Sequence, residues 1–141
     1  MSIWKSPIDL EQLTRWNAGT AAAHLGIEFT AAGDDWLEAR MAVDHRTFQP
    51  FHVLHGGASV LLAETVASCA SNLCLDGKTQ HSVGQEINAN HVRSVAGGHV
   101  TGRATAVHLG RNSHVWEIRI VDDEKRLVCI SRITMAVLTR A

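Results

Sequence analysis

One carboxylate interrupts an otherwise uncharged segment in the middle of the sequence. Glu64 is the only charged residue between His55 and Leu75, and most of this run predicts a single helix over residues 57–75 that is apolar on most of its faces. A carboxylate buried in such a helix is costly unless it is hydrogen-bonded or its pKa changes. Glu64 is therefore either a structural group bonded to a neighbouring chain or loop, or a group that takes part in chemistry.

The start of this helix favours chemistry. Gly56 and the glycine after it allow a ligand to approach the backbone closely, and the first amides of a helix have no internal acceptors. These N–H groups and the helix dipole suit a developing oxyanion. Gln49 and His55 add side-chain donors in the same loop, and Ser68 adds a hydroxyl one turn beyond Glu64. A carbonyl polariser, a carboxylate and a hydroxyl within two turns indicate an acyl-transfer site.

The elements that position these groups follow from periodicity and turn residues. A short helix is expected within residues 6–19, with Asp9 as its N-cap and Gln12 three residues on. Two strands precede the long helix, and four follow it as a meander whose turns are AGG, GRN and DDEK. The expected strands are residues 27–32, 36–43, 82–93, 99–109, 113–122 and 126–138.

Six strands and one largely apolar helix predict an α+β fold in which the sheet curls around the helix, as one domain over residues 1–141. A single sheet covers only part of such a helix. The remaining side of the helix and the sheet edges are therefore expected to contact a partner chain.

Composition limits the classes of partner and the compartment. A net charge of −1 offers no field that would attract nucleic acid or an anionic membrane. The first twelve residues lack the apolar region of a signal peptide, and no apolar run is long enough for a membrane span. Three cysteines in apolar segments, Cys69, Cys74 and Cys129, are expected to be free thiols, so a cytoplasmic location is expected.

The segment HRTFQPFHVLHGGASVLLAET, residues 45–65, resembles the hot dog-fold acyl-CoA thioesterases of the 4-hydroxybenzoyl-CoA and phenylacetyl-CoA type. The nearest branch contains bacterial 1,4-dihydroxy-2-naphthoyl-CoA thioesterases and enterobactin-pathway proofreading thioesterases. The segments HLGIEF, GDDWLEARMAVD, VGQEINANHVRS, HLGRNSHVWEI and CISRITMAVL extend the resemblance, in order, over nearly the whole chain. The resemblance implies a long helix wrapped by an antiparallel sheet, and hydrolysis of an acyl-CoA, with aromatic acyl groups favoured.

The resemblance also implies catalytic roles. Glu64 would attack the thioester or activate water, and the Gly56 amide would polarise the thioester carbonyl. Gln49 and His55 would position the carbonyl and the carboxylate, and Ser68 would hold the water or the carboxylate. The site would lie between subunits of a homotetramer built from two dimers, with no metal and no cofactor other than the coenzyme A of the substrate.

A coenzyme A site is implied by the same resemblance, because a nearly neutral protein must meet the phosphates locally. Without the resemblance, Arg93 and Arg111 would be interpreted as solvated charges at strand ends. The implied residues are Gly84, His91, Val92, Arg93, Ser94, His108, Leu109, Gly110, Arg111, Asn112 and Ser113.

Two other functions remain open. A hot dog dehydratase acting on acyl carrier protein would pair a histidine with an acid, and His55 with Glu64 could imitate that pair. A non-catalytic acyl-CoA binding protein would use the same fold without turnover. A carrier protein is also an alternative to coenzyme A for the thioesterase itself.

Several residues depart from the pattern or carry no clear role. Relatives usually have glycine where this chain has His52, which is expected at the rim of the site rather than as a zinc ligand with His55. Trp116 is expected in the core, whereas Trp4 and Trp16 would either cover an acyl pocket or pack. The remaining histidines are expected mostly at strand ends in solvent; they are His24, His45, His81, His99 and His114.

Overall fold

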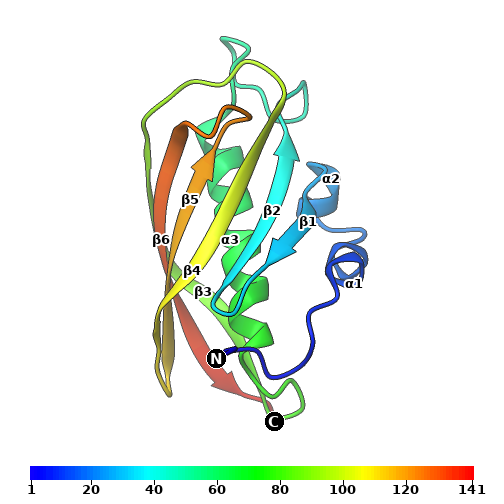
Figure 1. The fold of residues 1–141 in the computed structure, drawn as a ribbon, viewed down its shortest axis with the longest axis vertical. Coiled ribbons are helices and arrows are strands. Elements are labelled where there is room, and N and C mark those ends of the chain that lie inside the picture. Colours follow the sequence, from blue (N-terminus) through cyan, green and yellow to red (C-terminus); the bar gives the residue numbers. More distant parts are fainter.

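A long helix, α3 (Gly56–Leu73), runs along the concave side of a curved six-stranded antiparallel sheet in the computed structural model, which describes residues 1–141 (Figure 1). This is the hot dog fold that the sequence predicts. The short helices are α1 (Leu10–Trp16) and α2 (Ala21–His24). The strands are β1 (Glu28–Ala32), β2 (Trp36–Ala42), β3 (Gln80–His91), β4 (His99–Leu109), β5 (Ser113–Val121) and β6 (Leu127–Thr139).

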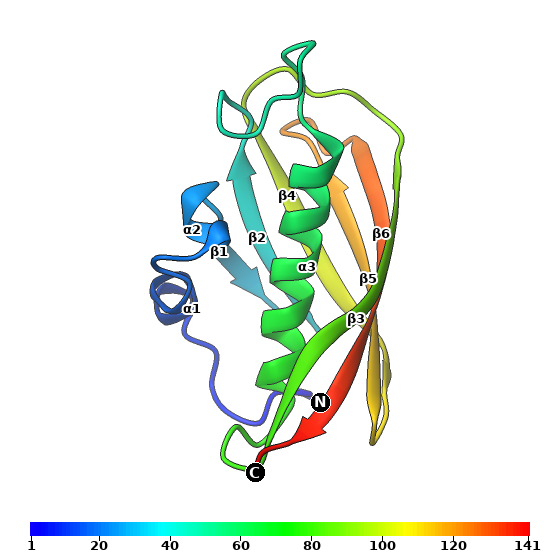
Figure 2. The same cartoon turned by 180° about the vertical axis from the view of Figure 1, so that it is seen from behind.

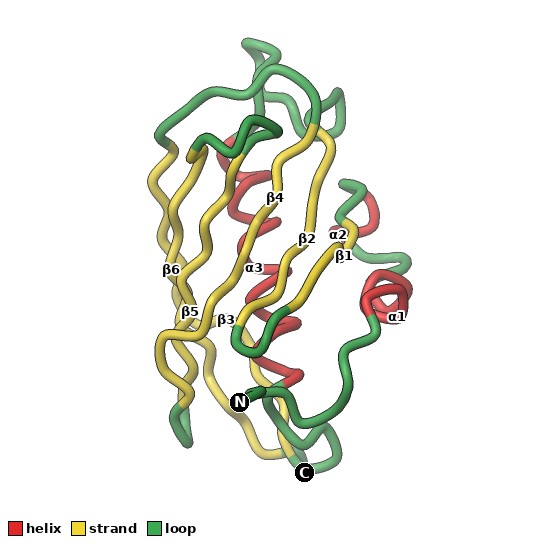
Figure 3. Tube along the Cα trace, in the orientation of Figure 1, coloured by secondary structure: helices red, strands yellow, loops and turns green.

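The sheet order is β1-β2-β4-β5-β6-β3, so the predicted four-stranded meander is wrong in one strand. The strands β4, β5 and β6 do form a meander, but β3 pairs with β6 at the sheet edge. Both edges of β4 are already occupied, by β2 on one side and β5 on the other. The AGG segment therefore belongs to a connection that crosses one end of the sheet instead of a hairpin (Figure 3).

One stripe of α3 is buried against the sheet, and the opposite stripe is only partly covered. The stripe toward the sheet repeats at helical spacing, and its buried residues are Ala58, Ser59, Leu62, Ala63, Val66, Ala67, Cys69, Ala70 and Ser71. The opposite stripe, which includes Leu61, Glu64 and Ser68, is only partly buried. Figure 2 shows α3 in front of the sheet, with α1 and α2 to one side. None of the helices combines the length and hydropathy that a bilayer-crossing segment requires.

The N-terminal segment closes one side of the core. Asp9 caps α1 as predicted, because its carboxylate accepts a hydrogen bond from Gln12 N at 3.1 Å. Trp116 on β5 is fully buried, also as predicted. The ring of Trp4 stacks on it at a centroid separation of 6.3 Å, which gives Trp4 a packing role. The predicted long helix begins at Gly56 rather than 57 and ends earlier, at Leu73.

Candidate active site

Glu64 lies on the open stripe of α3, where it contacts the edge strand β3. Its carboxylate fits against Gly84, and a Cβ atom on that glycine would collide with Glu64 Oε2. A β-bulge between Gly84 and Glu86 interrupts the pairing of β3 with β6 at this point. The missing side chain at Gly84 therefore provides the space that the carboxylate occupies.

A small hollow of about 260 Å³ surrounds this carboxylate; we call it the Glu64 hollow. Its lining residues are Trp16, Asn17, Glu64, Thr65, Ser68, Cys69 and Asn72. The Ser68 hydroxyl, one turn beyond Glu64, points to Met135 Sδ at 3.8 Å, a weak acceptor that leaves the hydroxyl available to a better one. Burial raises the pKa of the Cys69 thiol to about 11, so this wall of the hollow is a neutral thiol. Glu64 is the only acid in the hollow.

The first amide of α3 has no acceptor in the chain. His55 caps the helix, since its Nδ1 accepts from Gly57 N at 2.8 Å and its carbonyl accepts from Ala58 N at 3.0 Å. Gly56 N–H donates to nothing. An unpaired amide at the positive end of an 18-residue helix is an available donor for an oxyanion.

Gln49 is held by its own loop with a donor turned outward. Its backbone N–H donates to Val53 O at 2.9 Å, and its side-chain Oε1 accepts from Phe51 N. Because Oε1 is engaged, the side-chain NH₂ group remains free to donate. Gln49 and Gly56 border the same hollow, so its wall contains two residues with free hydrogen-bond donors.

We call this second cavity the helix-start hollow; its volume is about 370 Å³. It is lined by Gln49, Val53, Leu54, Gly56, Ser59, His91, Val92, Arg93, Ser94 and Val128. It contains an arginine and no acid. The His91 ring packs directly on Gly56, where an added Cβ would lie 2.8 Å from His91 Nε2. The end of β3 therefore forms one wall of the hollow beside the unpaired amide.

The two hollows share no lining residue within one chain. Gly56 and Glu64 are eight residues apart on one helix, which at 1.5 Å per residue is about 12 Å. Reacting groups must approach to roughly 3–3.5 Å. One chain therefore carries a donor half-site at Gly56 and a carboxylate half-site at Glu64, but no complete site.

The implied coenzyme A residues also fall into separate groups. His91–Ser94 border the helix-start hollow, whereas Gly84 lies beside Glu64. His108–Ser113 comprise the end of β4, the turn and the first residue of β5, and Leu109 lies in the same cross-strand row as Gly84. The seven residues from Gly84 to His91 span about 23 Å of strand. Within one chain the structure does not bring His108–Ser113 next to His91–Ser94.

His52 lies at the tip of the Gln49 loop in an unusual backbone conformation. Its φ angle is 60°, in the left-handed region where a side chain is strained and glycine is not. This explains why glycine suits the position. The His52 ring contacts Phe48 edge-on at a centroid separation of 5.8 Å. No three His, Cys, Asp or Glu side chains gather as a metal ion would require.

The sequence reasoning missed a buried polar cluster at the other end of α3. Ser82 Oγ donates to Ser71 Oγ at 2.8 Å, and Ser71 Oγ lies 2.7 Å from His114 Nδ1. His114 is 3% exposed, so its expected place in solvent is wrong. The signal was present in β5, where His114, Trp116 and Ile118 occupy the same face of an alternating strand.

Comparison with known proteins identifies the class of this fold and site. A family profile described as the thioesterase superfamily matches residues 51–129, which include Glu64, Gly84 and the helix start. A 1,4-dihydroxy-2-naphthoyl-CoA hydrolase of Escherichia coli is 52% identical over 136 residues, 96% of this chain and 99% of that protein. A proofreading thioesterase, EntH, of Cronobacter turicensis is 52% identical over 137 residues, covering 96% and 98%.

Solved structures similar to this chain are also thioesterases. A mutant of thioesterase PA1618 from Pseudomonas aeruginosa matches with a TM-score of 0.98 and 49% identity, over 99% of this chain and 100% of that one. A thioesterase from Haemophilus influenzae, HI1161, matches with a TM-score of 0.94 and 52% identity, over 97% and 95%. The chain belongs to the hot dog thioesterase superfamily, and its enzyme class is thioester hydrolase.

Proposed function

We propose that this enzyme hydrolyses an aromatic acyl-CoA to the free acid and coenzyme A. One observation carries the proposal: the Gly56 amide has no acceptor in the chain and borders a hollow with the free Gln49 amide donor. Such a pair of donors suits the oxygen of a thioester carbonyl as it gains negative charge. A carboxylate on the same helix, Glu64, supplies the other half of the chemistry.

In this mechanism the Gly56 N–H and the Gln49 side chain polarise the carbonyl. Glu64 either attacks the carbonyl carbon or removes a proton from the attacking water. The C–S bond breaks, the thiolate leaves and takes up a proton, and the acyl group departs as a carboxylic acid with one water consumed. Ser68 holds the water or the carboxylate, and His55 supports the helix start by capping it.

A complete site then needs a second copy of the chain. The open stripe of α3 and the unpaired edge of the 12-residue strand β3 are both available for a two-fold contact. Two antiparallel α3 helices side by side would bring Glu64 of one chain to Gly56 of the other. Two such dimers would form the tetramer that the resemblance implies.

Coenzyme A would be bound by groups from more than one chain. Arg93 and His91 border the donor half-site, where they suit phosphate oxygens. The β4–β5 turn, with His108 and Arg111, would then contact the nucleotide bound at a site of another subunit. No metal or redox cofactor enters this chemistry, and the cytosol, where acyl-CoA is made and used, is the proposed location.

The preference for aromatic acyl groups rests on the relatives. A protein 52% identical to this chain is named for a naphthoyl-CoA substrate. The Glu64 hollow, with Trp16 and the neutral Cys69 thiol in its wall, is compatible with an aryl group.

The test is free-thiol release from aryl, short-chain and long-chain acyl-CoAs by the wild type and by Glu64→Gln. Turnover concentrated on aryl-CoAs and lost in the variant is the expected result. Turnover on aliphatic chains alone would overturn the aromatic preference. Thiol release only from acyl carrier protein would overturn the choice of coenzyme A as carrier, and full turnover by Glu64→Gln would remove Glu64 from the mechanism.

A further inference from the structure

The Glu64 hollow adjoins a larger one that the proposed reaction does not use. This larger hollow measures about 590 Å³ and lies between α1 and the C-terminal end of α3; we call it the distal hollow. The two hollows have Trp16, Cys69 and Asn72 as common walls. These three residues therefore form the junction between the Glu64 hollow and the distal hollow.

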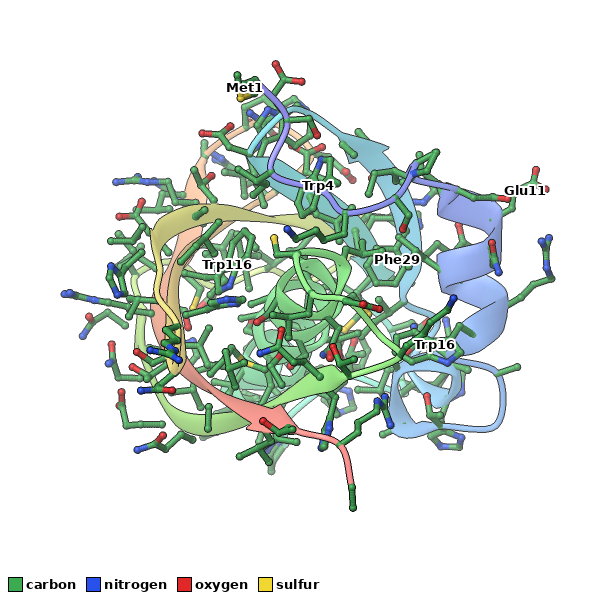
Figure 4. The ribbon with its side chains drawn as sticks, turned by 90° about the horizontal axis from the view of Figure 1, so that it is seen from below. Met1, Trp4, Glu11, Trp16, Phe29 and Trp116 are labelled. Atoms are coloured by element: carbon green, nitrogen blue, oxygen red, sulfur yellow. The ribbon has the colours of Figure 1, made fainter.

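Trp16 stands at the junction with its indole exposed. It is the last residue of α1 and is 66% exposed, whereas Trp4 and Trp116 stack on each other in the interior. Figure 4 shows Trp16 between α1 and the central helix, with Trp4 and Trp116 placed elsewhere around that helix. An exposed indole between two hollows offers a flat apolar surface to a ligand.

The other two shared walls are fixed and offer no free polar group. Asn72 donates to Ser68 O at 2.9 Å and to Ser82 O at 3.2 Å, and its Oδ1 accepts from Ser82 N at 2.9 Å. Cys69 is 5% exposed, and burial raises the pKa of its thiol. The junction therefore has one aromatic wall and two uncharged walls whose polar groups are bonded or buried.

The lining of the distal hollow has more basic than acidic side chains. Arg15 and Arg140 line it, and its one acid, Asp9, is already engaged as the cap of α1. Arg140 forms no ion pair, and the pair of Arg15 with Glu11 is a solvent-exposed contact at 3.6 Å that contributes little. Two guanidinium groups are thus available to an anionic group in the hollow.

We propose that the distal hollow is the outer part of the acyl site and takes acyl groups that end in a carboxylate. From Glu64 to Asn72, a wall of both hollows, the helix rises about 12 Å, so an acyl group that extends from Glu64 into the distal hollow needs more than one ring before its terminal acid. Trp16 stacks on the outer ring, and Arg140 with Arg15 binds the terminal carboxylate. The inference rests on the proposed thioesterase function and specifies its substrate class.

The experiment compares three substrates: benzoyl-CoA, biphenyl-4-carbonyl-CoA and its 4′-carboxy derivative. The wild type is expected to have its highest kcat/KM for the carboxylated biphenyl. Trp16→Ala should lower kcat/KM about tenfold for both biphenyl substrates, the equivalent of one stacking contact, and by a smaller factor for benzoyl-CoA, whose single ring lies closer to Glu64. Trp16→Phe, which keeps an aromatic surface, should recover most of the loss.

Arg140→Gln should lower kcat/KM about tenfold for the carboxylated substrate only, as the loss of a charge-assisted hydrogen bond predicts. Arg119→Gln is the matched control, because Arg119 lies on β5 in an exposed ion pair with Glu117. Equal effects of Trp16→Ala on all three substrates, or no preference for the carboxylate in the wild type, would overturn the distal site. No thiol release from any of the three would instead count against the proposed function itself.

Discussion

The two ends of α3 both carry serine and histidine side chains, yet they differ in how their polar groups are satisfied. At the start, Gly56 N–H has no acceptor and the Gln49 side chain has free donors beside a hollow. At the end, the Ser71 and His114 side chains are buried and bonded to each other. Buried polar groups are normally paired, so the unpaired end is the one that has capacity for a ligand.

Backbone strain is also found near the start of α3 and not near its end. His52, in the loop before α3, has a left-handed backbone conformation. The residues around Ser71 and His114 have no positive φ angle. Residue type alone, a serine near a histidine, would have pointed to the wrong end of the helix. Satisfaction of hydrogen bonds and local strain distinguish the reactive end from the structural one.

The largest expected effect tests whether the two half-sites meet across a dimer. Glu64→Gln should lower turnover roughly 10²–10⁴-fold, the usual contribution of a positioned acid or base. Gln49→Ala should lower it roughly 10²-fold, as the loss of one carbonyl donor does. In a hybrid of the two variant chains, one site carries both changes and the other carries neither. Thiol release by the purified hybrid should therefore rise far above that of either parent. Hybrid activity equal to the parents' mean would place both residues in one chain's site.

The next effect tests the space beside the carboxylate. Gly84→Ala adds a methyl group where Glu64 Oε2 lies, so the carboxylate must move. A displacement of about 1 Å in a catalytic group costs roughly 10²-fold in rate. We expect kcat to fall by about that factor in the thiol-release assay. Gly97→Ala is the control, because nothing lies within 4 Å of a Cβ there and Gly97 lines none of the three hollows. Similar kcat values for the two variants would mean that the position of Glu64 is not critical.

A substitution in the buried cluster at the C-terminal end of α3 should lower the free energy of unfolding and leave turnover unchanged. Ser71→Ala leaves His114 Nδ1 and Ser82 Oγ without their partner in the interior. An unsatisfied buried group costs about 1–3 kcal/mol. Urea denaturation should show that loss in the free energy of unfolding, with kcat unchanged. A fall in kcat with stability intact would contradict the structural role of this cluster.

His114 should also make the free energy of unfolding depend on pH. Burial, together with the nearby His108, lowers the pKa of His114 below its usual value. The unfolded chain therefore binds the proton more readily than the folded one does. This contribution to stability is complete above about pH 6.5, the ordinary histidine pKa, and is lost as the pH falls below it. Urea midpoints measured between pH 8 and pH 5 should decline in the wild type and decline less in His114→Gln.

The sequence predicted most of the fold because its signals are local. The apolar run of α3, the Asp9 cap and the alternation of β2, β4, β5 and β6 all lie within single elements. The place of β3 was wrong because pairing depends on which strand edges remain free after β2 joins β4. That information is not local, and a turn-like AGG segment gives no sign of it.

In the candidate site, too, local sequence signals identify some residues and not others. Glu64, Gly56 and Gln49 are identifiable in sequence because a helix start and a lone carboxylate are local features. The contact of Gly84 with Glu64 joins residues far apart in the chain, and so does the junction of the two hollows at Trp16. His114 was misplaced by treating histidine as a surface residue, although the alternation of β5 placed it with Trp116 in the interior.

The smallest expected effect tests the strain at the reactive end. His52→Gly removes a side chain from a left-handed residue, which relieves roughly 1–2 kcal/mol, and it also removes the edge-on contact with Phe48. The net gain in the free energy of unfolding should be about 1 kcal/mol or less in urea denaturation. If His52 only borders the site, kcat/KM stays constant and the strain has no catalytic function. If kcat/KM falls while stability rises, the imidazole contacts the substrate, and the strained backbone is what holds it there.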